Sequence, residues 1–178
     1  MKNIHAYRGF TLPEFLVLVT VLTILANLSV SGFTTLRNKF RMDNSINHLV
    51  RAFHLARHKS RLDASVVTVC KSRDGSQCHN DANWNEGWVV FSNTDADNPP
   101  QIDPGEAVLS TAGKTVSLQI SANREAFHIR PYGKRSTNGT FRYCSPTTAI
   151  RQRAVIVSYT GKPRIEDSGF IKPCTQDS

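Results

Sequence analysis

The sequence predicts an α+β protein in which one long N-terminal helix packs on an antiparallel β-sheet domain. Two patterns support this fold class. Apolar residues dominate residues 9–36 and recur with helical spacing to about Leu62, whereas short β-branched runs separated by turn residues fill the chain beyond Asp63. The 178 residues leave roughly 115 outside that helix, which is enough for one compact domain.

The first half of the predicted helix is an uncharged apolar run interrupted by one acid. Residues 9–36 contain no Lys or Arg, and a run of this length can cross a hydrocarbon core of about 30 Å. We therefore expect residues 10–36 to form a transmembrane or filament-core segment. Glu14 lies near its start, where an ionised carboxylate costs about 2.5 kcal/mol or more unless a partner neutralises it. The expected partner is a free α-amino group, made when a peptidase cuts after Gly9.

The second half of the helix is predicted to be amphipathic. Its apolar residues follow i, i+3, i+4, i+7 spacing, which marks one buried face: Ile46, Leu49, Val50, Phe53 and Ala56. Basic residues in the final turns suit the C-terminal end of a helix. The helix is expected to run from about Phe10 to Leu62.

Beyond the helix, the pattern changes to strands. The stronger candidates are residues 66–70, 87–91, 116–120 and 154–158, and the weaker ones are 127–129 and 140–143. Turn signals separate these runs, at Asp74-Gly75, Pro99-Pro100, Asn138-Gly139 and Thr160-Gly161.

All four cysteines follow the apolar segment, at Cys70, Cys78, Cys144 and Cys174. An even count on that side predicts an oxidising compartment and two disulfides, with three possible connectivities. We favour Cys70–Cys78, which closes a short loop, and Cys144–Cys174, which ties down the C-terminus. A zinc site that includes His79 is the competing interpretation, but the spacing fits no common zinc pattern.

The N-terminus resembles the class III signal of type IV pilins and type II secretion pseudopilins. That pattern is a short basic leader, here residues 1–9, followed by Phe-Thr-Leu and an acid. The resemblance implies that a prepilin peptidase removes the leader after Gly9 on the cytoplasmic side and methylates the Phe10 amine. Glu14 would then pair with the Phe10 amine of a neighbouring subunit. It also implies a single-pass inner-membrane protein whose residues 37–178 form a periplasmic domain.

Later segments narrow the resemblance. Residues 69–75 with Cys78, residues 87–91, residues 141–144 and residues 155–165 resemble, in this order, the FimT/GspH family of minor pilins and pseudopilins. This resemblance covers nearly the whole chain and implies a type IV pilin-like fold with other pilin or pseudopilin subunits as partners. The FimT side of the family, the minor pilins of competence and type IV pili, is the closer match.

Charge is strongly segregated along the domain. Residues 74–113 hold seven acidic residues and no Lys or Arg, whereas residues 114–164 hold ten basic residues and one acid, Glu125. The formal charge of +8 falls to +6 when the leader residues Lys2 and Arg8 are removed. A segregated basic half is the usual footprint of a polyanionic partner, although charge runs also form plain solvated faces.

The family resemblance suggests which basic residues bind DNA. FimT-like pilins of naturally competent bacteria bind DNA through a Gly-Arg-x-Arg motif near the C-terminus, and residues 161–164 (Gly-Lys-Pro-Arg) match it with Lys for the first Arg. We expect non-specific, salt-sensitive contacts with the backbone of duplex DNA, because few aromatic residues are interleaved for base stacking. The candidate contacts are Lys162, Arg164, Arg153, Arg151, Lys134 and Arg135.

The acidic loop at residues 95–106 offers oxygen ligands for calcium, but it lacks the spacing of an EF-hand. A solvated acidic hairpin is the preferred interpretation. No enzyme motif stands out, so neither catalysis nor a cofactor is expected.

The sequence therefore predicts a FimT-like minor type IV pilin that binds DNA for uptake in natural transformation. Two alternatives stay open. One is a GspH-like pseudopilin of type II secretion, and the other is a structural minor pilin that primes pilus assembly.

Overall fold

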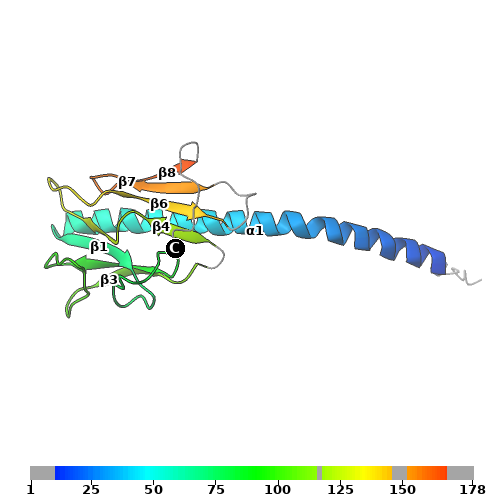
Figure 1. Cartoon of the computed structure of the whole chain (residues 1–178), viewed down its shortest axis with the longest axis horizontal. Coiled ribbons are helices and arrows are strands. Elements are labelled where there is room, and N and C mark those ends of the chain that lie inside the picture. The colour runs from blue at the N-terminus through cyan, green and yellow to red at the C-terminus, as the bar shows by residue number, and fades with distance from the viewer. Residues whose placement is uncertain (1–10, 116–117, 146–151, 168–178) are drawn as a thin grey trace, which may run out of the picture. The chain divides into compact units, whose positions relative to one another are not determined.

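The computed structural model describes residues 11–115, 118–145 and 152–167. Helix α1 spans Leu12–Leu62 (Figure 1), within two residues of the predicted bounds. The chain divides into two compact units, Met1–Arg37 and Asn38–Ser178.

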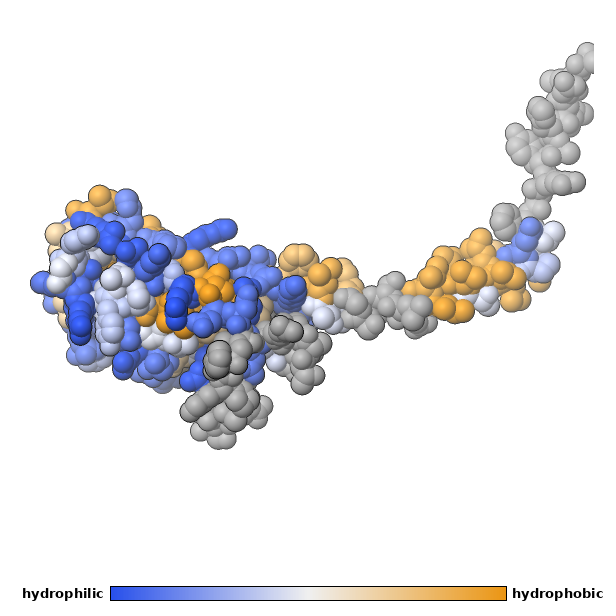
Figure 2. All heavy atoms as spheres, turned by 90° about the horizontal axis from the view of Figure 1, so that it is seen from above, coloured by the Kyte–Doolittle hydropathy of each residue, from blue (hydrophilic) through white to orange (hydrophobic). Residues whose placement is uncertain are grey.

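The first unit carries the apolar part of α1. Its described side chains are largely exposed, from Leu12 at 80% to Leu25 at 55%, and Figure 2 shows apolar side chains gathered along this stretch. The hydroxyls of Thr20 and Thr23 donate to backbone carbonyls one turn earlier, which satisfies these polar groups inside an apolar helix. Within the described part of the chain, no helix is both long and apolar enough to cross a membrane. The membrane-spanning role of residues 10–36 is therefore not confirmed.

The second unit contains eight described strands in two antiparallel sheets. One sheet has the order β3-β2-β1-β5 and the other β4-β6-β7-β8. The strands are β1 (Val66–Lys71), β2 (Trp88–Asn93), β3 (Val108–Ala112), β4 (Gln119–Ala122), β5 (Ala126–Ile129), β6 (Gly139–Cys144), β7 (Arg153–Val157) and β8 (Pro163–Asp167).

The α+β class and the antiparallel pairing are confirmed, and five of the six predicted strands are present in the described residues. The strand predicted at 116–120 is shifted, because β4 spans Gln119–Ala122, and residues 116–117 lie outside the described residues. The division into two sheets was not predicted. It arises because β4 pairs with β6, whereas β5, which follows after three residues, pairs with β1. Strands β3 and β8 were also missed.

The core of the second unit joins one face of α1 to residues of both sheets. The predicted helix positions Ile46, Leu49, Phe53 and Ala56 are fully buried, and Val50 packs at their margin. The Phe53 ring meets two phenylalanine rings edge-on, at centroid distances of 5.5 and 5.7 Å. Such aromatic pairs add packing energy beyond their buried area, so they fix the helix against the sheets.

The predicted disulfide Cys70–Cys78 is confirmed, with a Cα–Cα distance of 5.6 Å. Cys144 is also disulfide-bonded. Its expected partner, Cys174, lies outside the described residues, so that pairing stays a prediction.

Candidate functional site

The Glu14 carboxylate caps the start of α1. The backbone N–H and the hydroxyl of Thr11 donate to Oε2 of Glu14 at 3.1 and 2.9 Å. A Thr three residues before a Glu at a helix start is the capping-box pattern, in which the acid satisfies a free backbone donor. Glu14 therefore has a structural role in the single subunit besides its predicted pairing in a filament. Gly9 and Phe10 lie outside the described residues.

The predicted Gly-Lys-Pro-Arg motif forms the turn between β7 and β8. The Gly161 N–H donates to the Ser158 carbonyl at 2.8 Å, and the Ser158 N–H donates to the Lys162 carbonyl at 3.1 Å. Gly161 has a φ of +70°, and a Cβ there would approach Ile129 and Arg57 side-chain atoms to 3.1 and 3.2 Å. The glycine is thus needed for a left-handed, tightly packed turn.

The two cations of that motif differ in their surroundings. Lys162 and Arg164 are both exposed. Arg164 pairs with Glu166 at 3.2 Å, two residues along the same strand face. The Lys162 side chain has no ion pair among the described residues. Lys162 is therefore the more available of the two for an anionic ligand.

Arg153 does not join this surface. Its guanidinium contacts Asp43 on α1 and donates to Asp167 on β8 at 2.6 Å, and its side chain is 26% exposed. Asp43 lies fourteen residues before Arg57, which is about 21 Å along a helix. Arg153 thus lies at the opposite end of the unit from the β7–β8 turn and holds helix and sheet together. Arg151, another predicted contact, lies outside the described residues.

Lys134 and Arg135 line a groove of about 530 Å³ that sequence reasoning did not find. We call it the basic groove. It lies between the last turns of α1, the connection from β5 to β6, and the β7–β8 turn. Its charged and aromatic lining residues are Arg57, Arg61, Arg130, Tyr132, Lys134, Arg135 and Tyr159.

The arginines of the basic groove are held in place by neighbours. Arg57 donates through Nε to the Thr160 carbonyl at 2.9 Å, and Arg130 donates through Nη1 to the Arg135 carbonyl at 3.1 Å. The Arg61 guanidinium lies over the Tyr132 ring at 5.4 Å, and that of Arg135 over the Tyr159 ring at 5.0 Å. No carboxylate lies among the described lining residues.

Like charges accumulate in this groove. Desolvation and the neighbouring Arg61 lower the pKa of Arg57 from its usual value, although an arginine stays charged at neutral pH. Lys59, on the same stretch of helix, pairs instead with Asp63 at 2.9 Å. The helical spacing of Arg57 and Arg61 was visible in the sequence, but their meeting with residues 130–135 depends on the fold.

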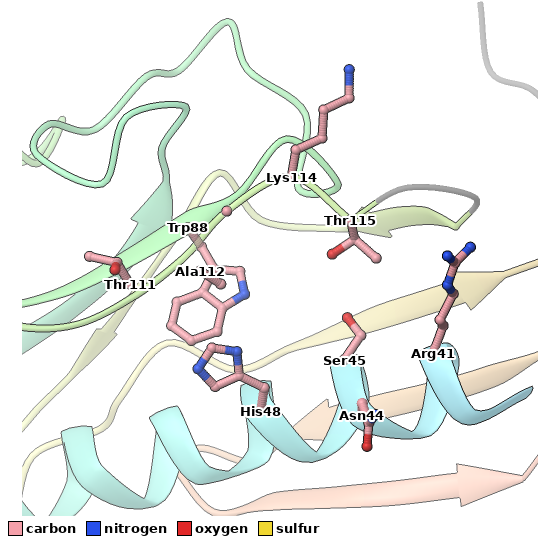
Figure 3. Close-up of a pocket in the computed structure, with 10 residues that line it drawn as sticks. Arg41, Asn44, Ser45, His48, Trp88, Thr111, Ala112, Lys114 and Thr115 are labelled. Carbon is pink, nitrogen blue, oxygen red and sulfur yellow. The ribbon is translucent and has the colours of Figure 1, made fainter. Parts of the chain in front are cut away.

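A second groove, of about 510 Å³, runs between α1 and the β2–β3 edge (Figure 3). The His48 and Trp88 rings face each other there at 4.9 Å, with Arg41 and Lys114 at the rim. Ser45 hydrogen-bonds the phenol of Tyr143, whose pKa is raised by burial. The Ser45 hydroxyl therefore stabilises the buried Tyr143, and the His48 ring packs against the Trp88 ring. Both contacts have a structural role.

The acidic loop brings three carboxylates together. Oxygens of Asp95, Asp97 and Asp103 lie within 4.8 Å of one another. Desolvation and the carboxylates of Asp95 and Glu106 raise the pKa of Asp103. Calcium takes six to eight oxygens, and Glu106 is directed instead to the Thr94 backbone N–H at 2.6 Å. The solvated acidic hairpin stays the preferred interpretation of this loop, and calcium binding stays an untested alternative.

Comparison with known proteins decides the family. Residues 45–161, about two thirds of the chain, match the model of the family described as Type II transport protein GspH. The chain belongs to the GspH family. The sequence-based resemblance is thereby confirmed for this GspH-family chain, whose matched range includes the basic groove. No curated protein matches it.

Among solved structures, the GspH-family chain is similar to the type IV minor pilin FimU of Pseudomonas aeruginosa strain PAO1. The crystal structure in space group P21 is 15% identical, covers 76% of this chain and 92% of its own, and has a TM-score of 0.50. The structure in space group P65 is 14% identical, covers 70% and 91%, and has a TM-score of 0.49. The first likeness shows a shared fold, which confirms the pilin-like architecture.

Proposed function

We propose that this GspH-family chain is a minor pilin of a type IV pilus. It is cleaved after Gly9, methylated at Phe10, and anchored in the inner membrane through residues 10–36 with residues 37–178 in the periplasm. The exposed apolar side chains of the first unit and the absence of Lys and Arg from residues 9–36 support this anchor. The GspH-family match and the pilin-like fold support assembly with other pilin subunits.

Glu14 is the residue on which assembly depends in this proposal. Its carboxylate pairs with the Phe10 amine of a neighbouring subunit, which neutralises both charges in an apolar filament core. The test is a Glu14→Gln variant, which keeps the capping hydrogen bonds with Thr11 but loses the charge. Incorporation of Glu14→Gln into sheared pili should fall strongly while the cellular level of the subunit stays unchanged. Wild-type incorporation, or an uncleaved leader in mass spectrometry of the native protein, would reject the proposal.

We further infer that the subunit binds DNA without sequence preference for uptake in natural transformation. The single observation that carries this inference is the cationic surface on which the exposed Lys162 and Arg164 adjoin the basic groove, whose five cations meet without a carboxylate among the described lining residues. Lys162 extends this surface from the adjoining turn. A polyanion releases counterions when it binds such a surface, so affinity should fall steeply with salt.

The test uses the full-length processed protein in detergent and a labelled DNA duplex. A Lys162→Ala, Arg164→Ala double variant should bind about tenfold more weakly, and its salt dependence should drop by about two counterions. An Arg142→Ala variant, outside the groove and the motif, is the matched control and should bind as the wild type does. Unchanged affinity of the double variant would reject the motif assignment.

The alternative is a pseudopilin of the type II secretion machine, which the description of the matched family favours. A deletion strain separates the possibilities. Loss of transformation with normal exoprotein secretion supports the DNA-binding minor pilin. Loss of secretion supports the pseudopilin, and loss of twitching and of surface pili together with transformation supports a structural subunit that primes assembly.

A further inference from the structure

The basic groove contains two features that duplex-backbone binding does not require. Tyr132 is 87% exposed and Tyr159 is 52% exposed. Single exposed aromatic side chains are common on protein surfaces, whereas exposed apolar groups gathered in one place often mark a binding site. Two such rings on different connections, with 26 residues between them in the chain, are brought into one groove by the fold.

Each exposed ring is paired with a guanidinium. Arg61 lies over Tyr132 and Arg135 over Tyr159, at centroid distances of 5.4 and 5.0 Å. These cation–π contacts hold one face of each ring and orient the arginine. Arg57 and Arg61 also suit the C-terminal end of the helix dipole, but that role explains neither the other three cations nor the tyrosines.

We propose that the basic groove binds a short stretch of single-stranded DNA, with unpaired bases stacked on Tyr132 and Tyr159 and phosphates bound by Arg57, Arg61 and Arg130. Unpaired bases present flat faces that stack on aromatic side chains and on guanidinium planes, whereas bases in a duplex are stacked on each other. Arg57 and Arg130 are fixed by bonds to backbone carbonyls and keep other N–H donors of the fork for phosphate oxygens. This inference rests on the proposed DNA-binding function and names the form of DNA that the groove accepts.

The groove has the capacity for this ligand. Its volume of about 530 Å³ lies in the range of pockets that enclose small organic ligands, so it accepts a few nucleotides and not a duplex of base pairs. The duplex contacts of the proposed function fall on the exposed side chains of Lys162 and Arg164, next to the groove. One surface can therefore hold a duplex on its outer face and a frayed end or single strand in the groove.

The experiment compares two DNA probes on the full-length processed protein in detergent, by fluorescence anisotropy. One probe is a labelled oligo(dT) of about 12 nucleotides, within the site size of single-strand binding folds, and the other is a duplex of equal length. A Tyr132→Ala, Tyr159→Ala double variant should bind the single strand roughly tenfold or more weakly, because stacking is lost. Its affinity for the duplex should stay within about twofold of wild type, because phosphate contacts are kept.

The matched control is the Tyr132→Phe, Tyr159→Phe double variant, which keeps both rings and should bind the single strand as wild type does. Because both tyrosines are exposed, neither variant should unfold the domain, and circular dichroism checks this. Unchanged single-strand affinity in the alanine variant overturns the groove proposal, even if duplex binding stands. Equal displacement of the oligo(dT) by poly-glutamate also overturns it, since the groove would then accept any polyanion.

The two proposals fail in different ways. Duplex binding that is lost in the Lys162→Ala, Arg164→Ala variant, together with single-strand binding that does not depend on the tyrosines, supports the proposed function and rejects the groove inference. Single-strand binding that depends on the tyrosines, with no measurable duplex binding, supports the groove and rejects the duplex assignment. Absence of binding to either probe rejects both.

Discussion

Replacing Arg153 by alanine separates a structural arginine from a DNA-binding one. The sequence placed Arg153 among the phosphate contacts, whereas the structure places its guanidinium between Asp43 on α1 and Asp167 on β8. We therefore predict that Arg153→Ala destabilises the domain and leaves DNA affinity within about twofold of the wild-type value, because a cation held by two carboxylates contributes little to a phosphate surface.

The expected loss of stability follows from the burial of each partner. Side-chain exposure is 26% for Arg153 and 32% for Asp43, so truncation leaves a half-buried carboxylate without its cation. Exposed ion pairs contribute about 0.2–1 kcal/mol and unpaired buried charges cost about 3–5 kcal/mol. The Asp43 contact lies between these limits, at about 1–2 kcal/mol. Asp167 is 78% exposed, so its pair adds only a few tenths of a kcal/mol.

The assay is urea unfolding of the full-length protein followed by the fluorescence of the buried Trp84 and Trp88. Arg153→Ala should lower the free energy of unfolding by about 2 kcal/mol, and Asp167→Ala, the control, by less than about 0.5 kcal/mol. A duplex titration runs in parallel. An Arg153→Ala protein of wild-type stability that binds DNA tenfold more weakly would refute this reasoning and restore Arg153 to the DNA surface.

Three other substitutions test the fold. Phe53→Ala should cost about 3–5 kcal/mol in urea unfolding because it empties a fully buried aromatic cluster, whereas the exposed neighbour variant His54→Ala should change stability by less than about 0.5 kcal/mol. Gly161→Ala should lower the free energy of unfolding by about 1–2 kcal/mol, because the φ of Gly161 is +70°. Gly113→Ala should leave the free energy of unfolding almost unchanged, because a Cβ there meets no atom within 4 Å. Burial lowers the pKa of His128 below its unfolded value of about 6.5, so the unfolded state takes up more protons, and stability should fall as pH drops through 6.5. His128→Gln should flatten that pH dependence between about pH 7.5 and 5.5. Equal slopes in both proteins would contradict the role of His128.

The sequence predicted α1 from the helical spacing of its apolar residues, and it predicted six strands from short runs of β-branched residues. Strands β3 and β8 escaped detection. Both are edge strands, partly exposed, and β8 begins at Pro163 and carries the charges of residues 164–167. In β8, proline and charge, which keep edge strands from pairing with other chains, also remove the hydrophobic pattern. Strand β3 carries neither, but its apolar run stops after Leu109 at small and polar residues.

The candidate site was predictable only in part, because the availability of a cation depends on its neighbours in space. Lys134 and Arg135 were identified from the charge run, and they do line the basic groove. The sequence assigned Arg57 and Arg61 to the end of a helix. Because they lie about 70 residues before Arg130 in the chain, the sequence did not show that these arginines line one groove. The sequence showed too few interleaved aromatic residues for base stacking, because it does not reveal that the fold brings Tyr132 and Tyr159 into one groove.

The basic groove lies by the last turns of α1, at a distance along the helix from Asn38, where the second unit begins. The second unit begins at Asn38, and Arg61 lies twenty-three residues later, about 35 Å along a helix. The cations of β7 and β8 pair with three carboxylates, those of Asp43, Glu166 and Asp167. None of these three residues lines the basic groove. The fold thus neutralises cations where helix and sheet must be held together. It leaves cations and aromatic rings together at the end of α1, where a polyanion can reach them without competing with the contacts that stabilise the domain.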